Sequence, residues 1–315
     1  MNVETASSYA EPPRGPVDDS TPLARAAQEH VDLARRVEQT RELARPEQTR
    51  IFVVANQKGG VGKTTSTVNV AAALALRGLR VLVVDLDPQG NASTALDIPH
   101  AEGQPGVYEA IVDGTPLTEL VRPCPQIPSL TVLPATIDLA GAEIELVSLV
   151  ARETRLHRAL QDHLQERDQA GDRIDYVLID CPPSLGLLTV NALVAAREVL
   201  IPIQCEYYAL EGLGQLVRNI DLVRAHLNPR LEVSTILLTM YDARTRLSAG
   251  VAHEVREHFG PKVLRTAIPR SVRISEAPSY QQTVLTYDPS SSGALSYLEA
   301  AREITEAADA AEKEE

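Results

Sequence analysis

The 315-residue sequence predicts an α/β fold, in which a mostly parallel, twisted sheet is flanked by helices on both faces. Two observations lead to this prediction. Short apolar runs typical of buried parallel strands recur along the chain, and segments with helical periodicity separate them. Strands that alternate with helices favour a parallel sheet with helical crossovers. The sequence has no internal repeat and no sign of a second core, so we expect one domain with appendages.

Taken in chain order, residues 21–45 have a helical pattern, which Pro46 ends because the residue before a proline is pushed out of the helical region. We expect three parts: a mobile, partly helical extension over 1–49, the globular domain over 50–298, and an acidic helix end or tail over 299–315. Strands are predicted over 51–55, 81–85, 130–133, 176–180, 199–203 and 233–238. Helices are predicted over 64–77, 187–196, 210–226, 248–259 and from about 293 onwards, and the stretch 137–163 is expected to be largely helical.

The formal net charge is −13, which by itself argues against nucleic acid as a partner. The charge is unevenly distributed, however. Residues 243–273 carry seven Arg and Lys side chains against Glu254 and Glu257, whereas 299–315 carries seven acids. A locally basic face is therefore compatible with the acidic total.

Targeting and redox signals indicate a cytoplasmic protein. No apolar stretch approaches the roughly 18 residues of a membrane-spanning helix, and the N-terminus lacks the pattern of a secretory signal. Cys124, Cys181 and Cys205 are widely spaced with no C-x-x-C pair. This spacing argues against a disulfide framework and against a cysteine-rich metal site.

The first chemical motif follows the strand predicted over 51–55 and opens a helix: Gln57-Lys58-Gly59-Gly60-Val61-Gly62-Lys63-Thr64-Thr65. Its glycines permit positive φ, so backbone N–H groups can converge on phosphate oxygens at a helix N-terminus. Lys63 can reach the β- and γ-phosphates, and the Thr64 hydroxyl can ligate Mg²⁺. The usual phosphate-binding loop pattern is G-x-x-x-x-G-K-[ST]. In this sequence Gln57 stands at its first position in place of Gly, and a second lysine, Lys58, follows it.

Two acidic motifs end predicted strands, where ligands bind in open parallel sheets. Asp85-Leu86-Asp87-Pro88-Gln89-Gly90-Asn91 follows the strand over 81–85, and Asp180-Cys181-Pro182-Pro183 follows the strand over 176–180. A carboxylate at either place can position a water or assist Mg²⁺. Taken alone, the segment over 85–91 would favour a capped turn, but its place downstream of the glycine-rich loop favours the catalytic interpretation.

These motifs resemble the deviant Walker A ATPases. With the segments 239–245 and 267–278, they resemble the ParA/Soj-type chromosome-partitioning ATPases from about residue 51 to 298. The resemblance implies a P-loop ATPase domain that hydrolyses ATP with Mg²⁺, forms an ATP-dependent homodimer, binds non-specific double-stranded DNA and responds to a ParB-type centromere-binding protein on the nucleoid. It implies that Lys58 reaches the partner's nucleotide and that Asp87 positions the attacking water, with Lys63 as the third catalytic residue.

The resemblance also implies the remaining site residues. The ATP-binding residues would be Lys58, Gly59, Gly60, Val61, Gly62, Lys63, Thr64, Thr65, Pro269, Ser271 and Arg273. Position 271 is commonly Asn in relatives. The metal site would use Thr64, Asp87 and Asp180, and DNA would contact Arg244 and Arg270.

Two other functions were weighed against this one. A MinD-like, membrane-cycling ATPase that positions cell division would need a basic amphipathic C-terminal helix, but 299–315 is acidic and has Ile304 as its one bulky apolar residue. A nitrogenase reductase or iron–sulfur carrier is disfavoured by the cysteine spacing. The extension is too short for a helix-turn-helix domain, so we expect no operator-specific repression. We predict that deletion of residues 1–49 leaves ATP hydrolysis intact. Three uses of the extension stay open: no role, binding of a partner, or added DNA affinity through Arg35, Arg36, Arg41 and Arg45.

Overall fold

The computed structural model describes residues 22–39, 42–206 and 209–312. One sheet runs through it in the order β3-β4-β2-β5-β1-β6-β7-β8, and every neighbouring pair is parallel except β3 and β4. The strands are β1 (Arg50–Val54), β2 (Val81–Asp85), β3 (Arg122–Pro123), β4 (Leu130–Leu133), β5 (Tyr176–Asp180), β6 (Glu198–Gln204), β7 (Glu232–Tyr241) and β8 (Val263–Pro269).

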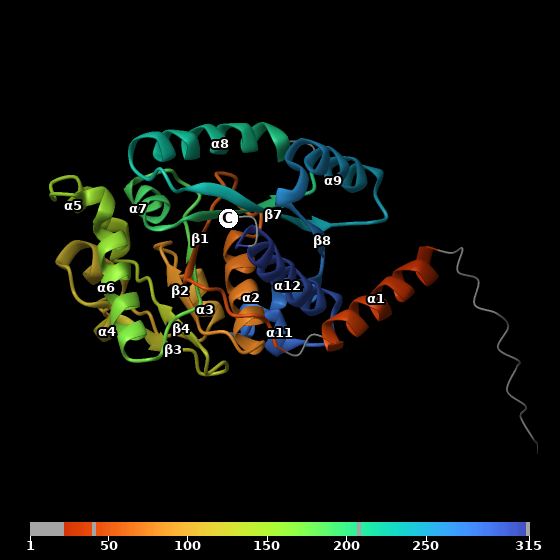
Figure 1. Cartoon of the computed structure of the whole chain (residues 1–315), viewed down its shortest axis with the longest axis horizontal. Coiled ribbons are helices and arrows are strands. Elements are labelled where there is room, and N and C mark those ends of the chain that lie inside the picture. Colours follow the sequence, from red (N-terminus) through yellow and green to blue (C-terminus); the bar gives the residue numbers. More distant parts are fainter. Residues whose placement is uncertain (1–21, 40–41, 207–208, 313–315) are drawn as a thin grey trace, which may run out of the picture.

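Helices cover both faces of this sheet (Figure 1). Successive residues of β1 point to opposite faces, because side chains alternate along a strand. Ile51 and Val53 enter a core with α5 (Leu139–Leu146), α6 (Arg155–Gln169), α7 (Leu187–Ala195), α8 (Ala209–His226) and α9 (Arg246–Phe259). Phe52 and Val54 enter a second core with α2 (Lys63–Leu76), α3 (Asn91–Ala95), α11 (Val284–Tyr287) and α12 (Ser292–Glu312). In the described part of the chain, no helix has both the length and the apolar composition to cross a membrane.

The remaining elements are short, apart from α1. They are α1 (Pro22–Gln39), η1 (Glu109–Asp113), α4 (Leu117–Leu120), η2 (Arg152–Thr154), η3 (Gly260–Lys262), α10 (Val272–Glu276) and η4 (Ala277–Tyr280).

The predicted fold class is confirmed, and all six predicted strands are present with ends shifted by at most a few residues. The stretch over 137–163, which the sequence predicts to be largely helical, is not one continuous helix. It divides into α5, η2 and α6, and Ala151 between them has φ +53°, which a continuous helix cannot contain. The sequence also missed β8, an edge strand that pairs only with β7 among the described strands.

Two of the acids near the C-terminal end of the chain, Glu299 and Glu303, pack against the domain. Both lie on α12 and are buried, at 4% and 7% exposure. The carboxylate of Glu303 accepts the backbone N–H groups of Arg265 (2.7 Å) and Thr266 (3.0 Å) on β8. Glu303 therefore satisfies donors on the open edge of the sheet, and the division of the chain at residue 299 into an acidic helix end or tail stays a prediction.

The N-terminal extension contacts the domain through its described residues. Leu43 is buried, and its N–H donates to the carbonyl of Arg77 (3.1 Å). Arg45 Nε donates to the carboxylate of Asp175 (3.0 Å), whose side chain is fully buried. The domain boundary near Arg50 stays a prediction, as does the mobility of the extension, much of which lies outside the described residues.

We expect Arg45→Ala to lower the free energy of unfolding by about 1–3 kcal/mol, because the buried carboxylate of Asp175 loses a charged donor. Urea unfolding measures this change. Arg230→Ala, at an exposed turn, is the control and should stay within about 0.5 kcal/mol of wild type. Equal stabilities of the two variants would show that the ion pair contributes nothing.

Candidate functional site

The strand order brings the three predicted motifs to one edge of the sheet. β5 lies between β1 and β2, so Asp180 is in register with Val54 on one side and with Asp85 on the other. The loop after β1 and the segment after β2 therefore flank Asp180 at the carboxyl ends of the strands. This is the edge where open parallel sheets bind ligands.

The glycine-rich loop between β1 and α2 has the backbone geometry that phosphate binding requires. Gly60 and Gly62 have φ values of +74° and +90°, in the left-handed region that glycine adopts readily. Gly62 immediately precedes α2, so the helix N-terminus opens directly at the loop.

Residues from two further strands hold this loop. The Thr239 hydroxyl, at the end of β7, donates to the carbonyl of Val61 (2.8 Å). Asn56 donates to the carbonyl of Pro202 on β6 (2.8 Å) and accepts from the N–H of Lys58 (3.0 Å). Neither contact has a local sequence signal, so the sequence alone predicts no role for Asn56 or Thr239.

The two lysines of the loop have different surroundings. Lys63 is 7% exposed, and its Nζ donates to the carbonyl of Lys58 (3.4 Å). Burial lowers the pKa of Lys63, while the nearby charges of Asp180 and Asp87 act in the opposite direction. Lys58 Nζ instead pairs with Glu206 Oε2 after β6 (3.2 Å), and both side chains are about half exposed.

Asp180 is fully buried, and the two oxygens of its carboxylate differ in their hydrogen bonding. The Thr67 hydroxyl donates to Oδ1 (3.1 Å), whereas Oδ2 has no hydrogen-bond partner in the described part of the chain. Burial and the neighbouring charge of Asp85 raise the pKa of Asp180 to about 8, although the hydroxyls of Thr64 and Thr67 favour its ionised form. An unpartnered buried carboxylate oxygen is costly unless a cation or donor completes it.

Asp85 and Asp87 differ in what their carboxylates already bind. Asp85 Oδ2 accepts from both the N–H (2.8 Å) and the hydroxyl (2.7 Å) of Ser93, and Oδ1 accepts from the N–H of Asp87 (3.3 Å). Burial raises the pKa of Asp85 to about 6. Asp87 is partly exposed and accepts from the N–H of Gln89 (3.0 Å). Asp85 therefore anchors the start of α3, and Asp87 has free acceptor capacity.

Gly90 and His100 fix the loop that follows Asp87. Gly90 has φ +62°, and its N–H donates to the carbonyl of Asp87 (2.9 Å). A Cβ at position 90 would lie 2.6 Å from His100 Cδ2 and 3.2 Å from the carbonyl oxygen of Ala135. The imidazole of His100 thus packs directly against the glycine backbone, and its Nε2 lies 3.2 Å from the Thr94 hydroxyl.

We expect Gly90→Ala to lower ATP hydrolysis and also to destabilise the chain by about 1–3 kcal/mol. The new methyl group would crowd a backbone oxygen, and alanine would have to adopt the left-handed conformation that glycine adopts readily. Phosphate release and thermal unfolding measure the two effects. Gly103→Ala is the matched control, since Gly103 also has positive φ (+75°) but open space around its Cβ position. Equal effects at both positions would assign the loss to backbone conformation alone.

The structure places Pro269, Ser271 and Arg273 farther along the same edge. Pro269 ends β8, which β6 and β7 separate from β1, and Ser271 immediately precedes α10. Arg273 forms ion pairs with Glu276 (3.3 Å) and Asp288 (3.4 Å). Its observed contacts therefore lie within its own part of the chain.

The structure brings Arg244 and Arg270 together on one cavity of about 850 Å³, here called the arginine cavity. Arg244 is 86% exposed and pairs with Asp242 (2.9 Å), whose pKa it lowers to about 2. Arg265 of the same basic segment pairs with Glu303 and Glu306 of α12 (3.7 Å each). The arginines that line the cavity are Arg36, Arg244, Arg256, Arg265, Arg270 and Arg302.

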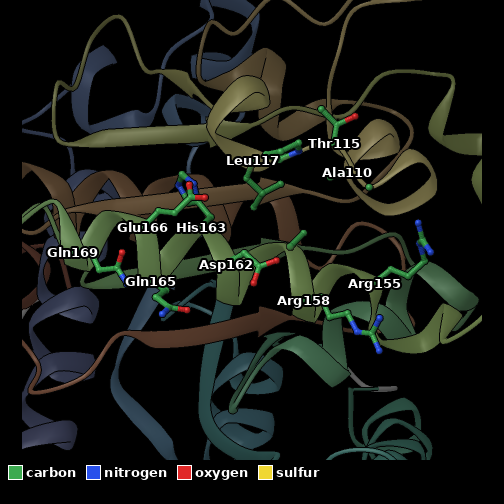
Figure 2. Close-up of a pocket in the computed structure, with 13 residues that line it drawn as sticks. Ala110, Thr115, Leu117, Arg155, Arg158, Asp162, His163, Gln165, Glu166 and Gln169 are labelled. Atoms are coloured by element: carbon green, nitrogen blue, oxygen red, sulfur yellow. The ribbon is translucent and has the colours of Figure 1, made fainter.

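A separate cavity of about 510 Å³ lies between α6 and the segment around η1 and α4 (Figure 2). His163 on its wall is 4% exposed, and its Nδ1 has no hydrogen-bond partner in the described residues. Asp162, Glu166 and Arg158 of α6 also line it. None of the predicted site residues does, so this cavity is distinct from the P-loop edge.

Comparisons with known proteins agree with this geometry. The family model described as "AAA domain" matches residues 49–233. The sporulation initiation inhibitor protein Soj of Bacillus subtilis strain 168 is 52% identical over 255 residues, which cover 81% of this chain and 98% of that protein. The chromosome partitioning protein ParA of Caulobacter vibrioides strain NA1000 is 50% identical, covering 81% and 93%.

Solved structures show the same fold. A cobyrinic acid a,c-diamide synthase from Mycobacterium smegmatis, crystallised with ADP and magnesium, is 39% identical with a TM-score of 0.68, over 81% of this chain and 93% of that one. The cell division ATPase MinD of Pyrococcus furiosus is 25% identical with a TM-score of 0.66, over 82% and 98%. With its P-loop edge and its 52% identity to Soj, the chain belongs to the Soj/ParA family of chromosome-partitioning ATPases.

Proposed function

We propose that this chain is a DNA-segregation ATPase, in which ATP closes two subunits into a DNA-binding dimer and hydrolysis releases them. The observation that carries the proposal is the convergence of Lys63, Asp87 and the unpartnered Asp180 Oδ2 on one glycine-rich loop. These are the groups that phosphoryl transfer from a metal-bound nucleotide requires.

The nucleotide would bind along residues 58–65, where Lys58, the glycines, Val61 and Lys63 would surround its phosphates, followed by Thr64 and Thr65. Mg²⁺ fits the oxygen donors present, because Thr64, Asp87 and Asp180 supply a hydroxyl and carboxylates. The orphaned Asp180 Oδ2 supports this assignment. Pro269, Ser271 and Arg273 would lie against the base and sugar.

Bound Mg²⁺ would neutralise phosphate charge, and Asp87 would orient the attacking water through its free acceptor capacity. Lys58 would reach the nucleotide of the second subunit, which requires it to leave Glu206. Because both side chains of that ion pair are about half exposed, breaking it costs little free energy. We expect slow basal turnover that a ParB-type protein would stimulate.

Double-stranded DNA would contact Arg244 and Arg270 without sequence preference, through its phosphates. Their shared position on the arginine cavity supports this role. Two subunits side by side would double the basic face, so DNA affinity would depend on the ATP state. In this proposal the protein would act in the cytoplasm, on the nucleoid.

The test is binding to non-specific duplex DNA with ATP, with ADP and without nucleotide, across a salt series. We expect binding with ATP alone, a steep loss with salt, and a loss of binding in Arg270→Glu but not in Arg230→Glu, an exposed control. If ATP binds but DNA does not in any state, the partition role is removed. Binding to anionic vesicles would then favour the MinD-like alternative.

A further inference from the structure

The helix α1 precedes the residues that the family model matches, yet it is docked on the domain. Val37 is 7% exposed, and its carbonyl accepts from Arg77 Nη2 of the domain (2.8 Å). Arg36 Nε lies 3.4 Å from Glu299 Oε1 on α12. Figure 1 shows α1 at the side of the domain, with one end near α12 and α11. Its second half therefore has a defined place.

That place is a wall of the arginine cavity. Leu33 and Arg36, one helical turn apart, line the same cavity as Arg244 and Arg270. The side chain of Arg36 is 56% exposed in spite of its ion pair with Glu299, so more than half of its surface faces solvent.

The charge of the cavity favours an anionic ligand. Six arginines line it against three acids, Asp242, Glu299 and Glu303. Glu303 is used by the N–H groups of β8, and Glu299 accepts from Arg302 Nη2 (2.8 Å). Burial alone would raise the pKa of Glu299, but the Arg302 hydrogen bond and nearby arginine charges lower it, so its charge is already compensated.

We propose that α1 is part of the DNA-binding surface, with Arg36 contacting the phosphate backbone of duplex DNA that Arg244 and Arg270 also hold. The proposal rests on the proposed function. It assigns the N-terminal helix a use in DNA retention, because a wall that carries an accessible arginine adds a phosphate contact to each subunit.

The experiment measures duplex DNA affinity of the full chain with ATP across a salt series, for wild type, Arg36→Ala and Arg36→Gln. We expect weaker binding and a salt slope smaller by roughly one per subunit in both variants. Arg35→Ala is the matched control: Arg35 is exposed on the same helix and does not line the cavity, so its affinity and slope should equal those of wild type. Melting temperatures establish that all variants are folded.

The outcomes separate this inference from the proposed function. Wild-type binding with an unchanged slope in the Arg36 variants overturns the role of α1 and leaves the partition function standing. Tighter binding in those variants also overturns it, since α1 would then cover the DNA site. If wild type does not bind DNA with ATP, both proposals fail together.

Discussion

Lys63→Ala is expected to reduce ATP hydrolysis by about 10²- to 10³-fold, the effect of removing one group aimed at developing phosphate charge. Lys63 starts α2 in a nearly dry position, with Asp180 and Asp87 as its neighbouring charges. Burial lowers its pKa by disfavouring the charged form, so a phosphate placed there gains a strong, poorly screened partner. Nucleotide affinity should fall together with turnover.

Lys262→Ala is the matched control. Lys262 is exposed in η3, which follows the C-terminal end of α9 and is not part of the glycine-rich loop. Phosphate release measures turnover, and titration with a fluorescent nucleotide measures binding. Since Lys63 is also a buried cation beside Asp180, the melting temperature of each variant must be compared without nucleotide. Turnover within a few-fold of wild type in a folded Lys63→Ala variant would contradict the proposed role of this lysine.

The sequence could predict the part of the site that depends on single strands. Each motif follows an apolar run, and in a parallel sheet the ends of such runs meet at one edge. The glycine pattern marks the positive φ values of Gly60 and Gly62. The apolar run before Asp180 indicates that this residue ends β5. Local pattern therefore predicts which residues reach the edge.

What the sequence could not predict depends on contacts between distant segments. The sequence does not show how the environments of Asp85 and Asp87 differ. In the structure, the N–H and the hydroxyl of Ser93 donate to the carboxylate of Asp85, whereas Asp87 stays accessible. Strand β8 lacks a continuous apolar run, because an edge strand has polar residues such as Arg265 and Thr266, and Glu303 from α12 completes their hydrogen bonds. In the sequence, Glu303 is only one of several acids in an acidic C-terminal segment.

A mixture of two inactive variants is expected to recover ATP hydrolysis. We expect Lys58→Ala and Asp87→Ala each to be inactive alone, the first because the partner's nucleotide lacks its lysine and the second because the attacking water is not oriented. In a two-fold symmetric dimer, a mixed pair has one site with an intact Asp87 that receives the intact Lys58 of the other subunit. An equal mixture should therefore reach roughly a quarter of wild-type turnover.

The control replaces Asp87→Ala by the double variant Lys58→Ala/Asp87→Ala, which can supply no lysine and should give no recovery. Phosphate release at fixed total protein measures all mixtures. If Lys58 instead acts on the nucleotide of its own subunit, every site in the mixture lacks one of the two residues and turnover stays at the level of the single variants. The ion pair of Lys58 with Glu206 would then describe a lysine held in its own site, whereas recovery would identify that pair as the contact broken when the dimer closes.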